Sequence, residues 1–269
     1  GGNVSVASTG AVSFTQTAAT SYGGTISGAG YIYRNGTNTV TFSADHSGFT
    51  GVTYVDGGVL KTTNDYAGPI VVASTGAFEF AYGTDKTFAS QITGAGEIYA
   101  SGTAKVTLTG DSRAFTGNMR VTDGTLELKH NTGGGSVYVS ASKTLRLDTG
   151  SQSFSVTSQI DGAGSMIKDS AGTATVVYDM ALSGGISVWD GTLKLQGGTV
   201  ASAGSVNASA TLNFDHSSAK TSSTNWSGSG SLTKTGVGTT TLSADMTGFT
   251  GTATVNGGTL ATSNSNTFG

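Results

Sequence analysis

Short glycine motifs recur along this chain at a spacing of roughly 66 residues, and this repetition limits the possible folds more than any other feature. SGAG at 27–30 returns as TGAG at 93–96, DGAG at 161–164 and SGSG at 227–230. FTG occupies 49–51, 115–117 and 249–251, with SGG at 183–185 in the third copy. The 269 residues therefore divide into four repeat units, approximately 12–77, 78–144, 145–211 and 212–269.

Aligned copies of the unit keep apolar residues in fixed columns, while the residues between the columns vary. Examples are Ile32, Ile98, Met166 and Leu232, then Leu60, Leu126, Leu193 and Leu260, and then Phe14, Phe80, Leu147 and Phe214. Alternation between apolar and variable positions with a period of two is typical of strands that bury one face. We therefore expect the columns to form the core and the variable positions to face outward.

Composition and run length favour strands joined by tight turns over helices. The chain has 43 glycines, one proline and no cysteine, and only 11% of its residues are charged. Threonine, valine, serine and glycine favour strands and turns, and runs such as TLRLD (144–148) are too short for βαβ crossovers.

The run lengths also suggest how the strands are stacked. Three strands with their turns take roughly 20 to 24 residues, so each unit predicts three coils of a parallel β-solenoid, about twelve coils in all. Equivalent residues of successive units would then share one face, roughly 14 Å apart. Two successive β-sandwiches are the alternative fold, but they do not predict the constant repeat.

The last unit resembles the autotransporter-associated β-strand repeat, also called the passenger-associated transport repeat. The residues that match its Gly-x-Gly-x-Leu-Thr-Lys opening and its Val-Asn-x-Gly-Thr-Leu close are Gly228, Gly230, Leu232, Lys234, Gly236, Gly238, Leu242, Thr250, Gly251, Val255, Asn256, Gly258 and Leu260. Asp245 and Phe249 depart from the usual Asn and Tyr but keep a turn-forming acceptor and an aromatic plug. Weaker copies lie in register at 28–60, 94–126 and 162–193.

This resemblance implies an all-β, single-stranded right-handed parallel β-helix that runs through residues 1–269 of a longer bacterial autotransporter passenger. Such a passenger is secreted by the type V route and displayed outside the outer membrane. A signal peptide and a membrane-anchoring C-terminal barrel are expected to flank the segment. The resemblance implies no catalytic residue and no cofactor, and from the residues themselves we expect no metal site. We expect a rigid stalk or adhesin that supports secretion and binds host surface molecules or other copies of itself.

Charge and hydropathy point away from nucleic acid and from a membrane-embedded segment. The net charge is −3, and the 13 lysines and arginines are scattered without a basic cluster. No apolar run approaches the roughly 18 residues that a membrane-spanning helix needs. We therefore expect a segment outside the membrane with no nucleic-acid partner.

An enzyme is not expected, although a β-helical carbohydrate-active or tail-spike-like protein is the alternative function. The repeat spacing leaves no insertion for a catalytic cleft. His46, His130 and His216 occupy three different positions of the unit, so we expect them at surfaces or turns. Asp45, Asp111, Asp179 and Asp245 recur in register, which favours turns that bond to backbone N–H groups. A row of calcium sites is the alternative for these carboxylates.

Exposed tyrosines are the one candidate for partner contact. In GYIYR (30–34), Ile32 belongs to a core column, so Tyr31 and Tyr33 should point outward, and Tyr99 takes the place of Tyr33 in the next unit. Aromatic anchors concentrate binding energy when a partner covers them. We therefore expect Tyr31, Tyr33 and Tyr99 to share one face and to carry the contact if this segment adheres. Ordinary surface tyrosines on a spacer are the alternative.

Overall fold

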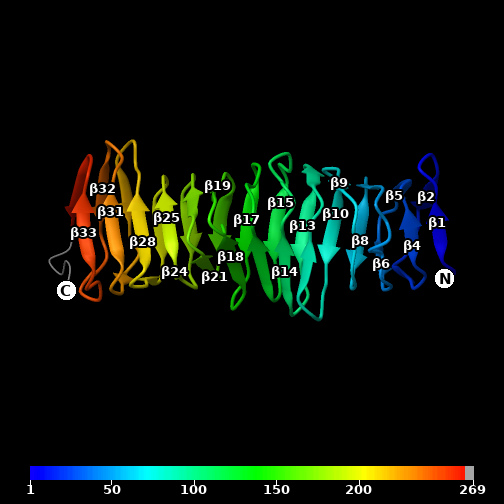
Figure 1. Cartoon of the computed structure of the whole chain (residues 1–269), viewed down its shortest axis with the longest axis horizontal. Coiled ribbons are helices and arrows are strands. Elements are labelled where there is room, and N and C mark those ends of the chain that lie inside the picture. The colour runs from blue at the N-terminus through cyan, green and yellow to red at the C-terminus, as the bar shows by residue number, and fades with distance from the viewer. Residues whose placement is uncertain (264–269) are drawn as a thin grey trace. The chain divides into compact units, whose positions relative to one another are not determined.

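Short strands joined by glycine-rich turns make up all regular structure in residues 1–263, the part of the chain that this computed structural model describes. The side chain of Val200 lies outside the description as well. The chain divides into two compact units, unit 1 (Gly1–Gly135) and unit 2 (Ser136–Gly269). Within each unit, every strand follows its neighbour in parallel register along one side of a coil, as Figure 1 shows. Each unit is a β-solenoid, which confirms the predicted fold class.

Unit 1 has three sides. Sheet I contains β2 (Ala11–Phe14), β5 (Tyr31–Arg34), β7 (Val52–Val55), β9 (Ile70–Val72) and β12 (Ile92–Gly94). Sheet II contains β3 (Thr20–Tyr22), β6 (Thr39–Phe42), β8 (Gly58–Thr62), β10 (Gly76–Phe80), β13 (Glu97–Ala100) and β15 (Asn118–Val121). The third side holds the pair β1 (Val4–Val6) and β4 (Ile26–Gly28), and then sheet III with β11 (Lys86–Phe88), β14 (Lys105–Leu108) and β16 (Thr125–Leu128).

Unit 2 repeats the plan, and its strands on the three sides are called sheets IV, V and VI. Sheet IV contains β17 (Ser136–Val139), β20 (Gln159–Gly162), β23 (Met180–Leu182), β26 (Thr199–Ala201), β29 (Lys220–Ser222), β32 (Thr239–Leu242) and β34 (Thr259–Thr262). Sheet V contains β18 (Thr144–Asp148), β21 (Ser165–Asp169), β24 (Ile186–Val188), β27 (Gly204–Val206) and β30 (Trp226–Ser227). Sheet VI contains β19 (Ser153–Val156), β22 (Thr173–Val176), β25 (Gly191–Leu195), β28 (Ala210–Phe214), β31 (Ser231–Lys234) and β33 (Thr252–Val255).

The length of one coil differs from the length expected from the sequence. In sheet II, Glu79 lies in register with Tyr99, and Tyr99 lies in register with Arg120 on the following coil. The chain therefore returns to the same side after roughly 20 residues, the lower end of what a structural repeat can take. At this coil length a repeat fills three coils and one further side. The predicted three coils per repeat are therefore wrong, although the total, about thirteen turns, is close to the expected twelve.

The extra side moves each repeat to the next sheet. In unit 1, β5 lies in sheet I but its equivalent β13 lies in sheet II, and β6 of sheet II is followed by β14 of sheet III. In unit 2, β20, β21 and β22 occupy sheets IV, V and VI, whereas their equivalents β30, β31 and β32 occupy sheets V, VI and IV. Equivalent residues of successive repeats therefore do not share a face.

The apolar columns nevertheless point inward on whichever sheet they lie. Every member of the column Ile32, Ile98, Met166 and Leu232 is fully buried. The column that ends in Leu260 is buried in its first three copies and only half-buried in the fourth, which belongs to the last described coil. The prediction of the core is confirmed, because period-two alternation depends on the strand and not on the sheet that holds it.

The recurring glycine motif marks a tight corner against the preceding coil. The first motif glycine has a φ of 101° at Gly28, 102° at Gly94, 124° at Gly162 and 104° at Gly228. A Cβ at these four positions would lie 2.1 to 2.2 Å from a backbone oxygen of the coil before. Both the left-handed conformation and the missing side chain are needed, so glycine recurs there.

In residues 1–263 we find no helix with the length and hydrophobicity needed to cross a membrane.

Candidate functional site

Three tyrosines gather on the outward face of sheet I. Tyr31 and Tyr33 alternate along β5 with Ile32 and Arg34, whose side chains are fully buried. Tyr54 of β7 lies in register with Tyr33 on the next coil. We call Tyr31, Tyr33 and Tyr54 the tyrosine cluster.

The rings of the tyrosine cluster contact one another. Tyr33 and Tyr54 stack with centroids 5.3 Å apart and planes 12° apart, and Tyr31 lies 6.2 Å from Tyr33 and 6.3 Å from Tyr54. All three side chains are half-buried. The mutual packing fixes the rings, so a partner would meet a preorganised aromatic surface. Tyr54 was not predicted from the sequence, because only the observed coil length places it beside Tyr33.

Tyr99 does not join this cluster, and the predicted shared face is wrong. It lies on β13 in sheet II, because the repeat advances by one side. Its hydroxyl donates to a carboxylate oxygen of Glu97, and burial together with this carboxylate raises the pKa of Tyr99 above its ordinary value. Nearby, Lys61 pairs with Glu79 at 2.9 Å. Tyr99 therefore belongs to a charged surface of unit 1, separate from the aromatic one.

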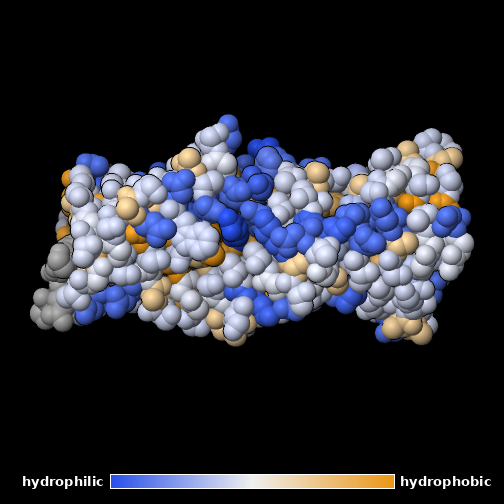
Figure 2. Space-filling view, turned by 60° about the horizontal axis from the view of Figure 1, so that its bottom comes forward, coloured by the Kyte–Doolittle hydropathy of each residue, from blue (hydrophilic) through white to orange (hydrophobic). Residues whose placement is uncertain are grey.

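Hydrophilic and neutral side chains cover most of the face drawn in Figure 2, and hydrophobic ones appear there only in small separate patches. A surface of this kind leaves local features, such as the tyrosine cluster, as the candidates for contact.

Two of the three histidines are core residues, so their predicted surface location is wrong, although the carbonyl of His46 accepts the Phe49 N–H across a turn. His130 is exposed, but His46 and His216 are fully buried. The Nδ1 atom of His46 accepts the Ile26 N–H at 2.9 Å, while its Nε2 has no partner. His216 lies 3.0 Å from the carbonyl oxygen of Gly197 through Nε2. Burial lowers the pKa of both imidazoles, so both are uncharged core side chains at pH 7.

The recurrent aspartates hold turns, as expected from the sequence. An Oδ1 atom accepts the N–H two residues later at Asp45 (2.7 Å), Asp111 (3.0 Å) and Asp245 (2.8 Å). Asp179 differs, because its Oδ1 accepts the N–H of Gly198 on the next coil. Among residues 1–263 no group of three or more His, Cys, Asp or Glu side chains is arranged to hold a metal ion.

Buried cations at the corners were missed from the sequence. Arg34, Lys168 and Lys234 occupy one column of the repeat, with Ala100 in the second copy, and all three cationic side chains are fully buried. The Lys168 Nζ donates to the carbonyls of Asp169 at 2.9 Å, Ser170 at 2.6 Å and Asp190 at 3.1 Å. Burial lowers the pKa of Lys168 to about 8. The Lys of the family motif, Lys234 in this chain, could have indicated that this column donates to backbone carbonyls. A corner leaves carbonyls that have no partner in a neighbouring strand.

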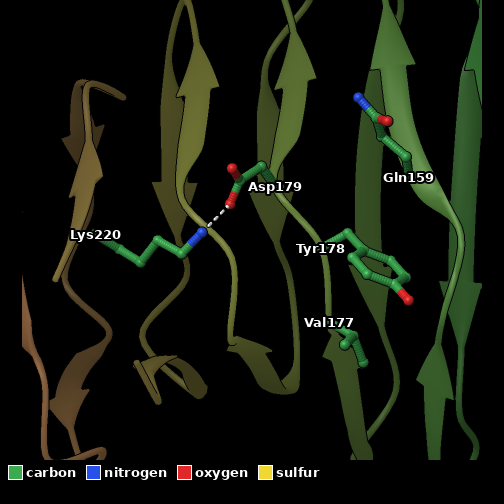
Figure 3. A pocket seen from close by; sticks show the side chains of 5 residues that line it. All are labelled: Gln159, Val177, Tyr178, Asp179 and Lys220. Atoms are coloured by element: carbon green, nitrogen blue, oxygen red, sulfur yellow. Dashed lines mark hydrogen bonds and ion pairs between the residues drawn. The ribbon is translucent and has the colours of Figure 1, made fainter. Parts of the chain in front are cut away.

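A hollow of about 270 Å³ opens at the surface of unit 2 and is lined by Gln159, Val177, Tyr178, Asp179 and Lys220 (Figure 3). Tyr178 is the aromatic residue of this lining, and 55% of its surface is accessible. Gln159 and Lys220 begin β20 and β29 of sheet IV, and Asp179 directly precedes β23 of the same sheet. The hollow therefore combines an aromatic ring, an amide and an ion pair.

An ion pair fixes one wall of this hollow. The Lys220 Nζ and the Gly198 N–H both donate to Asp179 Oδ1, each at 2.8 Å. These two donors, Lys220 first, lower the pKa of the Asp179 carboxyl, so that it is ionised at neutral pH. Lys220 reaches Asp179 across the coil of Gly198, which carries no side chain.

Comparison with known proteins gives a match to one family. The model of the passenger-associated transport repeat matches residues 34–62, 99–128 and 232–261. No curated protein and no solved structure matches the chain. The chain therefore carries three passenger-associated transport repeats, which confirms the resemblance seen in the sequence, and these repeats on a β-solenoid fit the stalk of an autotransporter passenger. This family implies secretion to the cell surface.

Proposed function

We propose that this chain is part of the stalk of a surface-displayed passenger and that its tyrosine cluster makes an adhesive contact, with host surface molecules or with another copy of the chain. The cluster is the observation that carries the proposal. Three rings fixed by mutual contacts of 5.3 to 6.3 Å bury further area on a partner at little entropic cost.

The stalk role follows from the packing, and we propose it as structural, not catalytic. Parallel coils cover one another's strand edges, so the body of each unit offers few backbone groups for unspecific pairing. Contact is then left to side chains on the outward faces. The charged side chains around Tyr99 pair mostly with one another, which makes them a poorer anchor than the tyrosine cluster.

The test replaces Tyr31, Tyr33 and Tyr54 together with serine in the full passenger displayed on cells. Cell aggregation and adhesion to a host-cell layer should fall by about tenfold or more if the rings anchor the contact. The thermal midpoint of the purified chain should change little, because the side chains lie outside the core.

Tyr99→Ser is the matched control, since this tyrosine faces outward from another sheet of the same unit. It should leave adhesion unchanged. Unchanged adhesion in the triple variant, with wild-type display, would contradict the proposal and leave this segment as a spacer.

A further inference from the structure

We propose that the hollow of unit 2 around Tyr178 binds a neutral glycan, with one sugar ring packed on the tyrosine and its hydroxyl groups bonded to Asp179 and Gln159. This site lies apart from the tyrosine cluster. Its biological use depends on the surface display proposed above, whereas the binding itself does not.

Two consecutive glycines lie on the coil that Lys220 crosses at one end of the hollow. Gly197 and Gly198 place no side chain on the coil between those of Asp179 and Thr221. Lys220 spans this gap to reach Asp179 and closes one end (Figure 3). The lining residues come from neighbouring coils, and the Lys220–Asp179 contact fixes one end, which gives a preformed depression.

The polar groups that line the hollow are able to bind, and one of them, Asp179, is also held in place. Asp179 receives both of its donors on Oδ1, and among the described residues its Oδ2 has no partner. The Gln159 side chain is exposed, and the hydroxyl of Tyr178 makes no hydrogen bond within the described chain. An ionised carboxylate forms strong hydrogen bonds to hydroxyl donors, and an amide can both donate and accept.

The charge of the lining selects against ionic ligands. Lys220 and Asp179 neutralise each other at 2.8 Å, so a charged ligand would have to break this pair. A wholly apolar ligand would strip water from the carboxylate without replacing its hydrogen bonds. A sugar ring meets both conditions, because it carries an apolar face for the Tyr178 ring and a rim of neutral hydroxyl groups.

The size and surroundings favour a short chain of sugars. A volume of about 270 Å³ is small for a complete drug-sized ligand and suits one ring. A second hollow of about 560 Å³ shares Val177 with the first and is lined also by Gln196, Asp215 and Thr235. Asp215 is already bonded to Lys194, Gln196 and Thr235. The second hollow can therefore take up the continuation of a glycan, while the first provides the specific contacts.

The experiment applies the purified 269-residue chain to a printed array of neutral oligosaccharides, with sialylated oligosaccharides on the same slide. The strongest neutral probe is then titrated in solution against the wild type and the variants. Tyr178→Ala and Gln159→Ala should each weaken binding, the tyrosine variant by about tenfold or more. Both side chains are exposed, so the thermal midpoint should stay at the wild-type value.

Tyr138→Ala is the matched control, because Tyr138 is an outward tyrosine of unit 2, 39% exposed, that does not line the hollow. It should bind like the wild type. Asp179→Asn keeps an oxygen for Gly198 but frees the Lys220 ammonium. This variant should lose affinity for neutral probes and gain affinity for sialylated ones, a change that loss of structure would not produce.

Failure of this site is distinguishable from failure of the adhesive role. An array without neutral binding, or binding that Tyr178→Ala leaves intact, would overturn the glycan site even if cells still aggregate through the tyrosine cluster. Binding of the purified chain to neutral probes with loss in Tyr178→Ala would support the site even if the triple tyrosine variant adheres normally.

Discussion

The interior of unit 1 contains more aromatic rings than the interior of unit 2, where aliphatic side chains occupy several of the same repeat positions. In unit 1, ring contacts connect Phe14, Tyr22, Phe42, His46, Tyr66, Phe78, Phe80, Tyr82 and Phe88. In unit 2, the fully buried Leu145, Leu147 and Val176 occupy the repeat positions of Phe78, Phe80 and Phe42, and the buried Lys168 and Lys234 cap corners.

The difference shows that the coiled backbone, and not one kind of core side chain, defines this fold. Parallel pairing sets the backbone in both units, and the interior requires only inward side chains whose volumes fit. The stability of the two units should respond differently to substitutions in their cores. The following experiments test this from the largest expected effect to the smallest.

Phe80→Ala should be the most damaging change. Phe80 contacts Phe78 at 4.9 Å, Phe88 at 5.3 Å and Tyr82 at 5.8 Å, so its removal leaves a cavity and breaks three ring contacts. We expect a loss of about 3–5 kcal/mol in the free energy of unfolding from urea titration, against about 2–5 kcal/mol for Leu193→Ala in unit 2.

Hydrogen exchange should show the loosening in unit 1 for the Phe80 variant and in unit 2 for the Leu193 variant. Equal loosening of both units by either variant would contradict the view that each unit has an interior of its own.

Lys168→Met should cost about 1–3 kcal/mol, because it removes the ammonium donor from three carbonyls of partly buried residues. Lys194→Met is the control in the same unit, since Lys194 forms a partly exposed pair with Asp215 at 2.7 Å and should cost less than about 1 kcal/mol. Thermal unfolding of both variants measures the difference. Equal costs would mean that the corner carbonyls find water instead.

Acid should weaken unit 1 through His46. Burial among aromatic rings lowers the pKa of this imidazole below its ordinary value of 6.5, so between the two pKa values the unfolded chain binds a proton that the folded chain does not. The stabilisation is present above pH 6.5 and declines as the pH falls. We expect a loss of up to about 1–2 kcal/mol between pH 7 and pH 5.

His46→Asn keeps an acceptor for the Ile26 N–H and removes the titration. Hydrogen exchange of unit 1 at pH 5 and pH 7 should then show a smaller difference in the variant than in the wild type. His216 keeps its own pH dependence in unit 2, because its pKa is also lowered by burial. An unchanged response of unit 1 would show that His46 is not the titrating group.

Tyr31→Ser should have the smallest effect, about 0.5 kcal/mol, although it also removes a ring from unit 1. Tyr31 makes two tilted contacts, at 6.2 and 6.3 Å, and lies outside the core. A thermal midpoint close to that of the wild type is expected. A loss comparable to that of Phe80→Ala would mean that the tyrosine cluster is part of the fold and not a surface available for binding.

The fold was predictable because the pattern of apolar residues that specifies it lies within each short strand. Alternation along each short strand identifies inward side chains such as Ile98 and Leu126, and the repeat shows that the same strand is used again. The number of residues per coil was not predictable from the repeat, because a coil boundary leaves no mark of its own in the sequence. That one quantity decided whether Tyr99 would lie with Tyr33 or on another sheet.

Burial of polar side chains also depends on neighbours from other coils. Glu127 alternates with Leu126 and Leu128 and so predicts an exposed residue, yet only 3% of it is accessible. Lys105 and Thr107 of the preceding coil bond to its carboxylate at 2.8 Å each. The hollow at Tyr178 was likewise missed, since Gly197, Asp179 and Lys220 meet only after the coil length is known.

The advance of each repeat by one side has a consequence for how a stalk of this kind changes length. Within a solenoid, gaining or losing a single repeat would turn every later coil by one side about the axis. Three repeats would be needed to return the later coils to their original orientation. Recombination between repeats would thus change the direction that later coils face around the axis in steps of one side. It would change which neighbours a distal binding surface faces on a crowded cell, without altering a single residue of that surface.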